Sequence, residues 1–183
     1  MKFQPLHRTI SDNSLLVIRE ASINDAEELK AAVKEYVEES EFVPYNQGEF
    51  QLSLKEEIEW IESFQQMPNS LLLIAEVNGK IVGNLSLNGN KRQQLQHTAE
   101  IGIGILREYR GKGIGKAFFE AVLSWTKEDP VLEMLILEAH ADNALALKLY
   151  RKVGFEQVGI LPRHIKTLAG NYADTIIMTM KIK

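Results

Sequence analysis

A short segment rich in glycine and basic residues has the composition of an anion-binding turn. It reads Arg110-Gly111-Lys112-Gly113-Ile114-Gly115-Lys116 and lies between a strand-like run at 100–106 and a helix-like run at 114–127. At a helix start the backbone N–H groups point outward without partners inside the helix, and glycine has no Cβ to keep an anion away. The segment is therefore predicted to cradle a pyrophosphate, with Arg110 and Lys116 adding positive charge.

Two common nucleotide-binding motifs do not fit this segment. A Rossmann fold needs a parallel sheet with repeated crossovers, whereas Asn78-Gly79 between two apolar runs predicts an antiparallel hairpin. A Walker loop needs Ser or Thr after its lysine, and Lys116 is followed by Ala117. A domain that binds another nucleotide through a glycine turn is the less favoured alternative.

A second segment, residues 143–155, also carries residues that can do chemistry. Asn143 is predicted to cap a helix, and Tyr150 lies two helical turns later on the same face. Leu145, Leu149 and Val153 are expected to hold this helix against the sheet. By type alone a buried tyrosine is more often a core residue than a catalyst. However, a phenol with a pKa of about 10 is a neutral proton donor at neutral pH.

These two segments resemble the signatures of the GNAT superfamily of acyl-CoA-dependent N-acyltransferases. Residues 110–115 match Q/R-x-x-G-x-G/A, and residues 143–155 carry Asn, Ala, Tyr, Gly and Phe at similar spacing. The resemblance covers nearly the whole chain and implies a single domain, 1–183, with an α/β (α+β) fold. Its mixed, mainly antiparallel sheet would have about six to seven strands and about four flanking helices, and the strands near 98–106 and 132–140 would splay to admit a pantetheine arm.

The resemblance implies an acetyl-CoA-dependent N-acetyltransferase, with acetyl-CoA as cosubstrate. In similar proteins a strand N–H polarises the thioester carbonyl and the signature tyrosine, here Tyr150, protonates the leaving thiolate. The other residues that it assigns to the cosubstrate are Ile103, Gly104, Ile105, Asn143 and Ala146. Transfer is expected to be direct, because the chain has no cysteine and no serine in a nucleophile motif. A non-catalytic acyl-CoA-binding regulatory module on the same fold is the alternative.

An attacking amine must lose a proton, so a general base is needed. Glu100, on a strand expected to line the cleft, is the first candidate, acting directly or through water. An exposed or ion-paired Glu100 is an equally weighted alternative. Glu138 and His140, near the end of the other splayed strand, are reserves, and His97 has a weaker claim.

The acceptor is expected to be a small-molecule or peptide amine whose identity the sequence does not reveal. Glutamates cluster at 35, 38, 39 and 41, where a solvated charged face is favoured over a pocket for a cationic amine. Phe42 and Tyr45 are candidates for the acceptor pocket, and core packing is favoured for Trp60.

The remaining elements follow from periodicity and capping signals. Helices are predicted from Asn24, with Glu27 as its capping partner, and from Ser53, with Glu56. Gly102 and Gly104 inside a strand suggest a bulge or the close approach of a ligand. The apolar run at 132–138 predicts a strand covered on both faces. Further strands are predicted at 15–19, 70–77, 81–87, 155–161 and 172–182.

The amino-acid composition limits the kinds of binding partner that are expected. The 183 residues include 21 Lys+Arg and 25 Asp+Glu, a net charge of -4 without a basic stripe, so no nucleic acid is expected. Without a signal-like or membrane-spanning run, a cytoplasmic protein with no membrane partner is expected. The four histidines show no metal-ligand spacing, so no metal is predicted. A homodimer is one expected assembly, since dimers are frequent among similar proteins.

Overall fold

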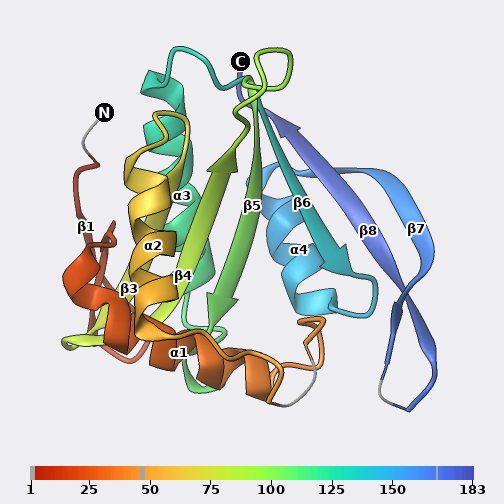
Figure 1. The fold of residues 1–183 in the computed structure, drawn as a ribbon, viewed down its shortest axis with the longest axis horizontal. Coiled ribbons are helices and arrows are strands. Elements are labelled where there is room, and N and C mark those ends of the chain that lie inside the picture. Colours follow the sequence, from red (N-terminus) through yellow and green to blue (C-terminus); the bar gives the residue numbers. More distant parts are fainter. Residues whose placement is uncertain (1–2, 46–47, 168) are drawn as a thin grey trace.

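The computed structural model describes residues 3–45, 48–167 and 169–183, which form one eight-stranded sheet in the order β1-β2-β3-β4-β5-β6-β8-β7 (Figure 1). Every neighbouring pair is antiparallel except β5 and β6. The strands are β1 (Leu6–Thr9), β2 (Leu15–Glu20), β3 (Leu71–Val77), β4 (Lys80–Gly89), β5 (Thr98–Ile105), β6 (Met134–His140), β7 (Glu156–Lys166) and β8 (Tyr172–Lys181). The mixed, mainly antiparallel fold is confirmed, with the short edge strand β1 in addition to the expected strands.

Four α-helices cover the two faces of the sheet, with α1 and α2 on one side and α3 and α4 on the other (Figure 1). Their bounds are α1 (Ala26–Glu39), α2 (Leu54–Gln65), α3 (Ile114–Glu128) and α4 (Ala144–Val153). The apolar side chains form one cluster on each face. The larger cluster, under α3, includes Phe118 and Phe119, and the smaller includes Leu29 and Ile61 from α1 and α2.

Local signals place several element ends where the sequence predicts them. The Ser53 hydroxyl accepts a hydrogen bond from the Glu56 N–H, and the Glu56 carboxylate accepts one from the Ser53 N–H at 2.7 Å. Asn78 and Gly79 both have positive φ, 50° and 84°, as a tight hairpin between β3 and β4 requires. Gly154 ends α4 with φ 112°. These three confirmations come from interactions within a few residues.

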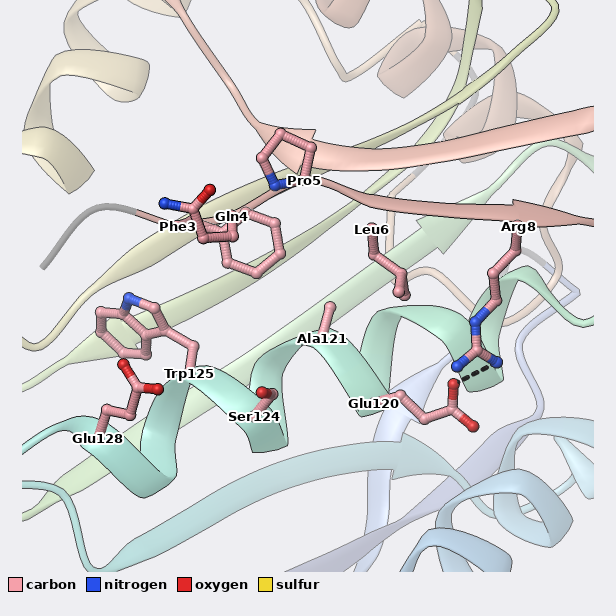
Figure 2. A pocket seen from close by; sticks show the side chains of 10 residues that line it. All are labelled: Phe3, Gln4, Pro5, Leu6, Arg8, Glu120, Ala121, Ser124, Trp125 and Glu128. Atoms are coloured by element: carbon pink, nitrogen blue, oxygen red, sulfur yellow. Dashed lines mark ion pairs between the residues drawn. The ribbon is translucent and has the colours of Figure 1, made fainter.

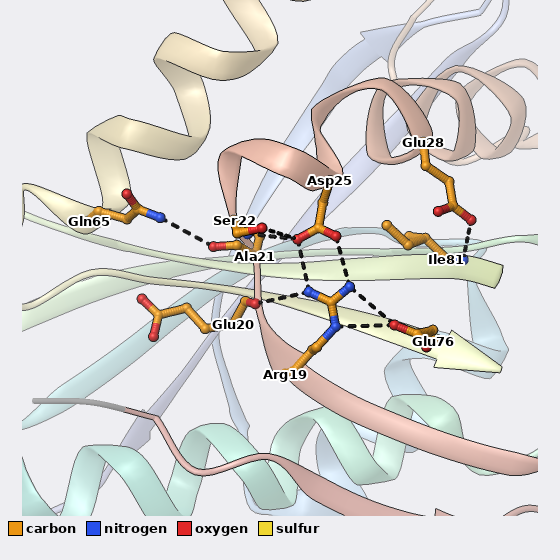
Figure 3. Close-up of polar contacts among 9 residues, drawn as sticks. All are labelled: Arg19, Glu20, Ala21, Ser22, Asp25, Glu28, Gln65, Glu76 and Ile81. Atoms are coloured by element: carbon orange, nitrogen blue, oxygen red, sulfur yellow. Dashed lines mark hydrogen bonds and ion pairs between the residues drawn. The ribbon is translucent and has the colours of Figure 1, made fainter. Parts of the chain in front are cut away.

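The start of α1 differs from the prediction. A 3-10 turn at Ile23–Asp25 precedes the helix, and the Asp25 carboxylate, not that of Glu27, accepts the hydrogen bond from the Ser22 N–H at 2.8 Å (Figure 3). Asp25 also receives two 2.8 Å hydrogen bonds from the Arg19 guanidinium, which in turn contacts Glu76 on β3. The capping box is therefore formed by Ser22 and Asp25, with Arg19 also bound to the Asp25 carboxylate, and the predicted Asn24 and Glu27 box is wrong.

The parallel strands β5 and β6 pair only at their beginnings. Thr98–Glu100 lie opposite Met134–Ile136, whereas β5 pairs with β4 from Ala99 to Ile105 without a break. Beyond residues 100 and 136 the two strands diverge (Figure 1). The predicted splay is confirmed, and it leaves the facing backbone edges of residues 101–105 and 137–140 without a partner strand.

The central strand β6 is covered less than its apolar run predicted. Leu135, Leu137 and Ala139 are buried on the face of α3 and α4. On the opposite face Glu138 is exposed, whereas the His140 side chain is only 8% exposed and its ring centroid lies 5.3 Å from that of Phe42. The expectation of cover on both faces is therefore wrong at Glu138, because helices α1 and α2 lie over other strands.

Candidate active site

The glycine turn leads into α3 with an uncapped helix start. Gly111 and Gly113 have φ of 76° and 94°, and a Cβ placed on either would meet no atom within 4 Å. Gly113 is the N-cap residue, offers no side-chain hydrogen bond, and no acidic residue follows in the first turn. The first N–H groups of α3 therefore have no capping side chain and lie at the positive end of the helix dipole, an arrangement that suits a pyrophosphate.

Gly115 has a different role from its two neighbours. A Cβ there would lie 2.7 Å from Leu149 Cδ2, so this glycine lets α4 pack closely against α3. The packing couples the glycine turn to the helix that carries Tyr150. Open space therefore surrounds Gly111 and Gly113 but not Gly115, and the role of the three glycines in ligand access stays a prediction.

The three basic side chains of the turn are already engaged. Arg110 Nε donates to the Ile105 carbonyl at 2.8 Å and so ties the turn to the end of β5, while burial lowers its pKa. Lys112 forms a 2.8 Å ion pair with Asp12. Lys116 pairs with Glu120 at 3.3 Å, one helical turn away. The backbone N–H groups are therefore the donors of the turn that none of these side-chain interactions engages.

Tyr150 lies on α4 with an unused hydroxyl. Its side chain is 7% exposed and packs edge-on against Phe119 and Phe155, with ring centroids 5.7 and 6.2 Å away. No described residue forms a hydrogen bond with the hydroxyl, and burial raises the pKa of Tyr150 to about 12. The side chain is thus a rigid, neutral proton donor for which no described side chain competes.

Helix α4 is held by only part of the predicted stripe, since Leu149 and Val153 pack against the larger apolar cluster and Leu145 does not. Asn143 Oδ1 accepts a hydrogen bond from the Ala146 N–H at 3.2 Å, which confirms the cap. Leu145 is 63% exposed, whereas Leu147 and Tyr150 are buried. The predicted contact of Leu145 with the sheet is wrong, because α4 is rotated so that Leu147 and Tyr150 point inward.

The two glycines of β5 are explained by packing and not by a bulge. The register between β4 and β5 is continuous from Ala99 to Ile105. A Cβ on Gly104 would lie 2.2 to 2.5 Å from three ring carbons of Tyr36, and one on Gly102 would lie 2.8 Å from Ser86 Oγ. Tyr36 of α1 therefore lies directly on Gly104, and the expected bulge is absent.

The candidate bases differ in availability. Glu100 is exposed, occupies the last paired position of β5 before the splay, and shares a strand face with Gly102 and Gly104. His140 Nδ1 accepts a hydrogen bond from the Asp142 N–H at 3.2 Å, so its other ring nitrogen carries the proton in the neutral form. Glu138 is exposed. The backbone carbonyl of His97 accepts hydrogen bonds from the N–H groups of Glu133 and Met134, at the start of β6. Glu100 and Glu138 thus remain the accessible bases.

An open cleft with a volume of about 960 Å³ lies beside the end of β6, and its lining includes neither Glu100 nor Tyr150. Phe42 and Tyr45, after α1, line one wall together with Glu38 and Glu41. The opposite wall comes from the end of β6 and from the β7–β8 hairpin, and it includes Glu138, His140, His164 and Lys166. The cleft is rich in carboxylates and aromatic rings, as a pocket for an amine would be. Trp60 lies outside this lining and packs edge-on against Phe64.

Glu57 is a notable residue that the sequence reasoning missed. It belongs to α2, and its side chain is fully buried. Neither carboxylate oxygen has a hydrogen-bond partner among the described residues. Burial raises its pKa to about 7. The sequence feature that could have revealed it is a charged residue between Leu54 and Ile61 on the apolar stripe of α2. Leu54 itself is 43% exposed.

A smaller cavity of about 320 Å³ lies between the N-terminal segment and the C-terminal half of α3 (Figure 2). Phe3 and Trp125 line it, and an ion pair between Arg8 and Glu120 closes one end. None of the predicted site residues lines it. In the part of the chain that the structure describes, no three His, Asp or Glu side chains are grouped to hold a metal, and no helix is long and apolar enough to cross a membrane.

The splayed strands, the uncapped glycine turn and the free tyrosine define an acyl-CoA-dependent transferase. The profile of the acetyltransferase (GNAT) family matches residues 31–155, which include both signatures. The chain therefore belongs to the GNAT family and is an N-acetyltransferase that takes its acetyl group from acetyl-CoA.

Sequence relatives and solved structures agree with this family. The chain is 27% identical over 119 residues to the L-amino acid N-acetyltransferase AaaT of Escherichia coli, covering 65% of this chain and 73% of that protein. It is 34% identical over 99 residues to an N-alpha-acetyltransferase of Sulfurisphaera tokodaii, covering 50% of this chain and 59% of the relative. A GNAT acetyltransferase structure from Streptococcus pneumoniae superposes with a TM-score of 0.86 at 27% identity, over 92% of this chain and 99% of that one.

Proposed function

We propose that the enzyme acetylates a primary amine by direct transfer. Acetyl-CoA and the amine would bind on opposite sides of the gap between β5 and β6. The N–H groups of residues 111–116 would hold the pyrophosphate of acetyl-CoA. The unpaired edge of β5 at Ile103–Ile105 would pair with the pantetheine amides, as a peptide adds to a sheet edge. Asn143 and Ala146, at the start of α4, would contact the arm from the other side.

The chemistry then needs one base and one acid. The amine nitrogen attacks the thioester carbonyl carbon, the C–S bond breaks, and a strand N–H stabilises the charge that develops on the carbonyl oxygen. Glu100 takes the proton that the amine loses, directly or through water, and Tyr150 gives a proton to the departing sulfur. The observation that carries this proposal is the buried Tyr150, whose hydroxyl forms no hydrogen bond with any described residue.

The cleft favours a cationic amine as acceptor, and the names of the relatives point to an α-amino group. Carboxylates of Glu38, Glu41 and Glu138 in the cleft would attract an ammonium before it loses its proton. The two relatives are named for an L-amino acid and for an N-alpha position. A free amino acid or a peptide N-terminus is therefore the acceptor to test first. Cytoplasmic location, a homodimer and the lack of a nucleic-acid partner stay predictions.

Acetyl-CoA is expected to raise the melting temperature, whereas ATP and NAD are not. A ligand at a hundred times its dissociation constant stabilises a fold by about 2.7 kcal/mol. Gly113→Val should abolish this shift, because a branched side chain at φ 94° would strain the turn and fill the space in front of the N–H groups. Gly170→Val, at another glycine of positive φ in the β7–β8 turn, is the matched control and should keep the shift. An acetyl-CoA shift preserved in Gly113→Val would contradict the cradle.

Glu100→Gln is expected to lower kcat/KM for the amine by about 100-fold, in the range typical of a general base. The dissociation constant for acetyl-CoA should change little, because the proposed contacts of the cosubstrate do not include the Glu100 carboxylate. Glu138→Gln on the other splayed strand is the matched comparison, with steady-state rates measured across pH. If Glu138→Gln loses activity and Glu100→Gln does not, the base is Glu138.

A further inference from the structure

Tyr36 occupies the place that a strand side chain would take beside the predicted thioester site. Three of its ring carbons lie within 2.5 Å of where a Gly104 Cβ would stand. Gly104 is the middle residue of the segment Ile103–Ile105, which is assigned above to the pantetheine amides that precede the thioester. The ring therefore forms a wall on the α1 face of that segment.

This wall is held in position from several sides. The Tyr36 hydroxyl donates to Asn84 Oδ1 at 3.0 Å, and Asn84 is buried on β4 directly opposite Gly104. The ring packs against both apolar clusters. Burial, with smaller contributions from Glu57 and Tyr45, raises the pKa of Tyr36 far above 10, so the hydroxyl keeps its proton and its hydrogen bond at any working pH. Because protein interiors are closely packed, the Tyr36 ring is expected to resist being pushed aside by a ligand.

We propose that Tyr36 restricts the acyl donor to acetyl-CoA by closing the space into which a longer acyl chain would extend. The proposal rests on the function proposed above, in which the pantetheine arm pairs with Ile103–Ile105 and its thioester lies beside a strand N–H of the same segment. An acetyl group ends after one methyl. The additional methylenes of a propionyl or butyryl group would have to displace a ring that is fixed between Gly104, Asn84 and the two cores, and overpacking of this kind is unfavourable.

The test compares acyl-CoA binding in three proteins by isothermal titration calorimetry, which needs no knowledge of the acceptor. Wild type should bind acetyl-CoA at least tenfold more tightly than butyryl-CoA, with propionyl-CoA between them, since one methylene in a fitted pocket changes affinity by about 10-fold or more. Tyr36→Leu should bring acetyl-CoA and butyryl-CoA within about threefold of each other. Tyr36→Phe keeps the ring on Gly104 and should retain most of the preference.

Two further variants serve as controls for this experiment. Tyr36→Met, which fills the core with a flexible chain, takes the place of Tyr36→Leu if the latter does not fold. Tyr172→Leu, at an exposed tyrosine that stacks on Arg163 in the β7–β8 hairpin, should keep the wild-type preference. Equal affinity of wild type for all three donors, or an unchanged preference in a folded Tyr36→Leu or Tyr36→Met protein, would overturn the inference alone. Failure of wild type to bind any acyl-CoA would overturn the proposed function instead.

Discussion

Replacing Tyr150 with phenylalanine is expected to lower kcat by about 100-fold or more, with the free energy of unfolding and the dissociation constant of acetyl-CoA nearly unchanged. Loss of a general acid typically costs 10²- to 10⁴-fold in rate. The hydroxyl forms no hydrogen bond with a described residue, so its removal leaves no orphaned partner, and the ring still packs against Phe119 and Phe155. Steady-state kinetics and thermal unfolding of the same preparation measure the two effects together.

The matched control for this change is Tyr172→Phe, which removes a hydroxyl from an exposed tyrosine on β8 and should leave kcat unaltered. Unchanged turnover in Tyr150→Phe would remove this residue from the mechanism. A fall in melting temperature equal to the loss expected from a buried hydrogen bond, with normal turnover, would identify a structural hydroxyl.

Much of the fold could be predicted because its signals are local. The Ser53 and Glu56 box, the Asn78-Gly79 turn and the Gly154 helix end each depend on residues within a few positions. The glycine turn is also local, since positive φ at Gly111 and Gly113 follows from the chain itself. The splay of β5 and β6 came from the family resemblance, because the sequence of either strand alone does not reveal where pairing stops.

The features that sequence reasoning missed depend on contacts between distant segments. Gly104 is explained by Tyr36, which lies on a helix far earlier in the chain. Strand β1, of sequence Leu-His-Arg-Thr, has only one apolar residue and is a strand because it pairs with β2. The cap of α1 is a different case, because Ser22 and Asp25 form a local capping box three residues apart that the prediction from Asn24 and Glu27 overlooked.

The adjacent residues Glu56 and Glu57 provide the second large expected effect, with opposite signs for the two side chains. Glu57→Gln is expected to stabilise the fold by about 3 kcal/mol at pH 8, since a rise in pKa from 4.5 to about 7 corresponds to that free energy at about 1.4 kcal/mol per unit. For a chain of this size, the melting temperature would rise by roughly 6 to 12 °C. Burial is the cause, only partly offset by the positive charge of Lys30.

The pH dependence of the stability gained by Glu57→Gln shows whether the gain comes from removing a buried charge. The folded-state pKa of Glu57 lies above the unfolded value, so between pH 4.5 and 7 the folded state holds a proton that the unfolded state has lost, and wild-type stability falls as pH rises. The advantage of Glu57→Gln should therefore be absent near pH 4 and complete above pH 7. Glu56→Gln is the adjacent control. Hydrogen bonds from the Ser53 N–H and hydroxyl lower the pKa of Glu56, so this substitution should destabilise the fold at neutral pH and less so in acid. Destabilisation by Glu57→Gln at pH 8 would show that its carboxylate has a partner in solution that stabilises its charge.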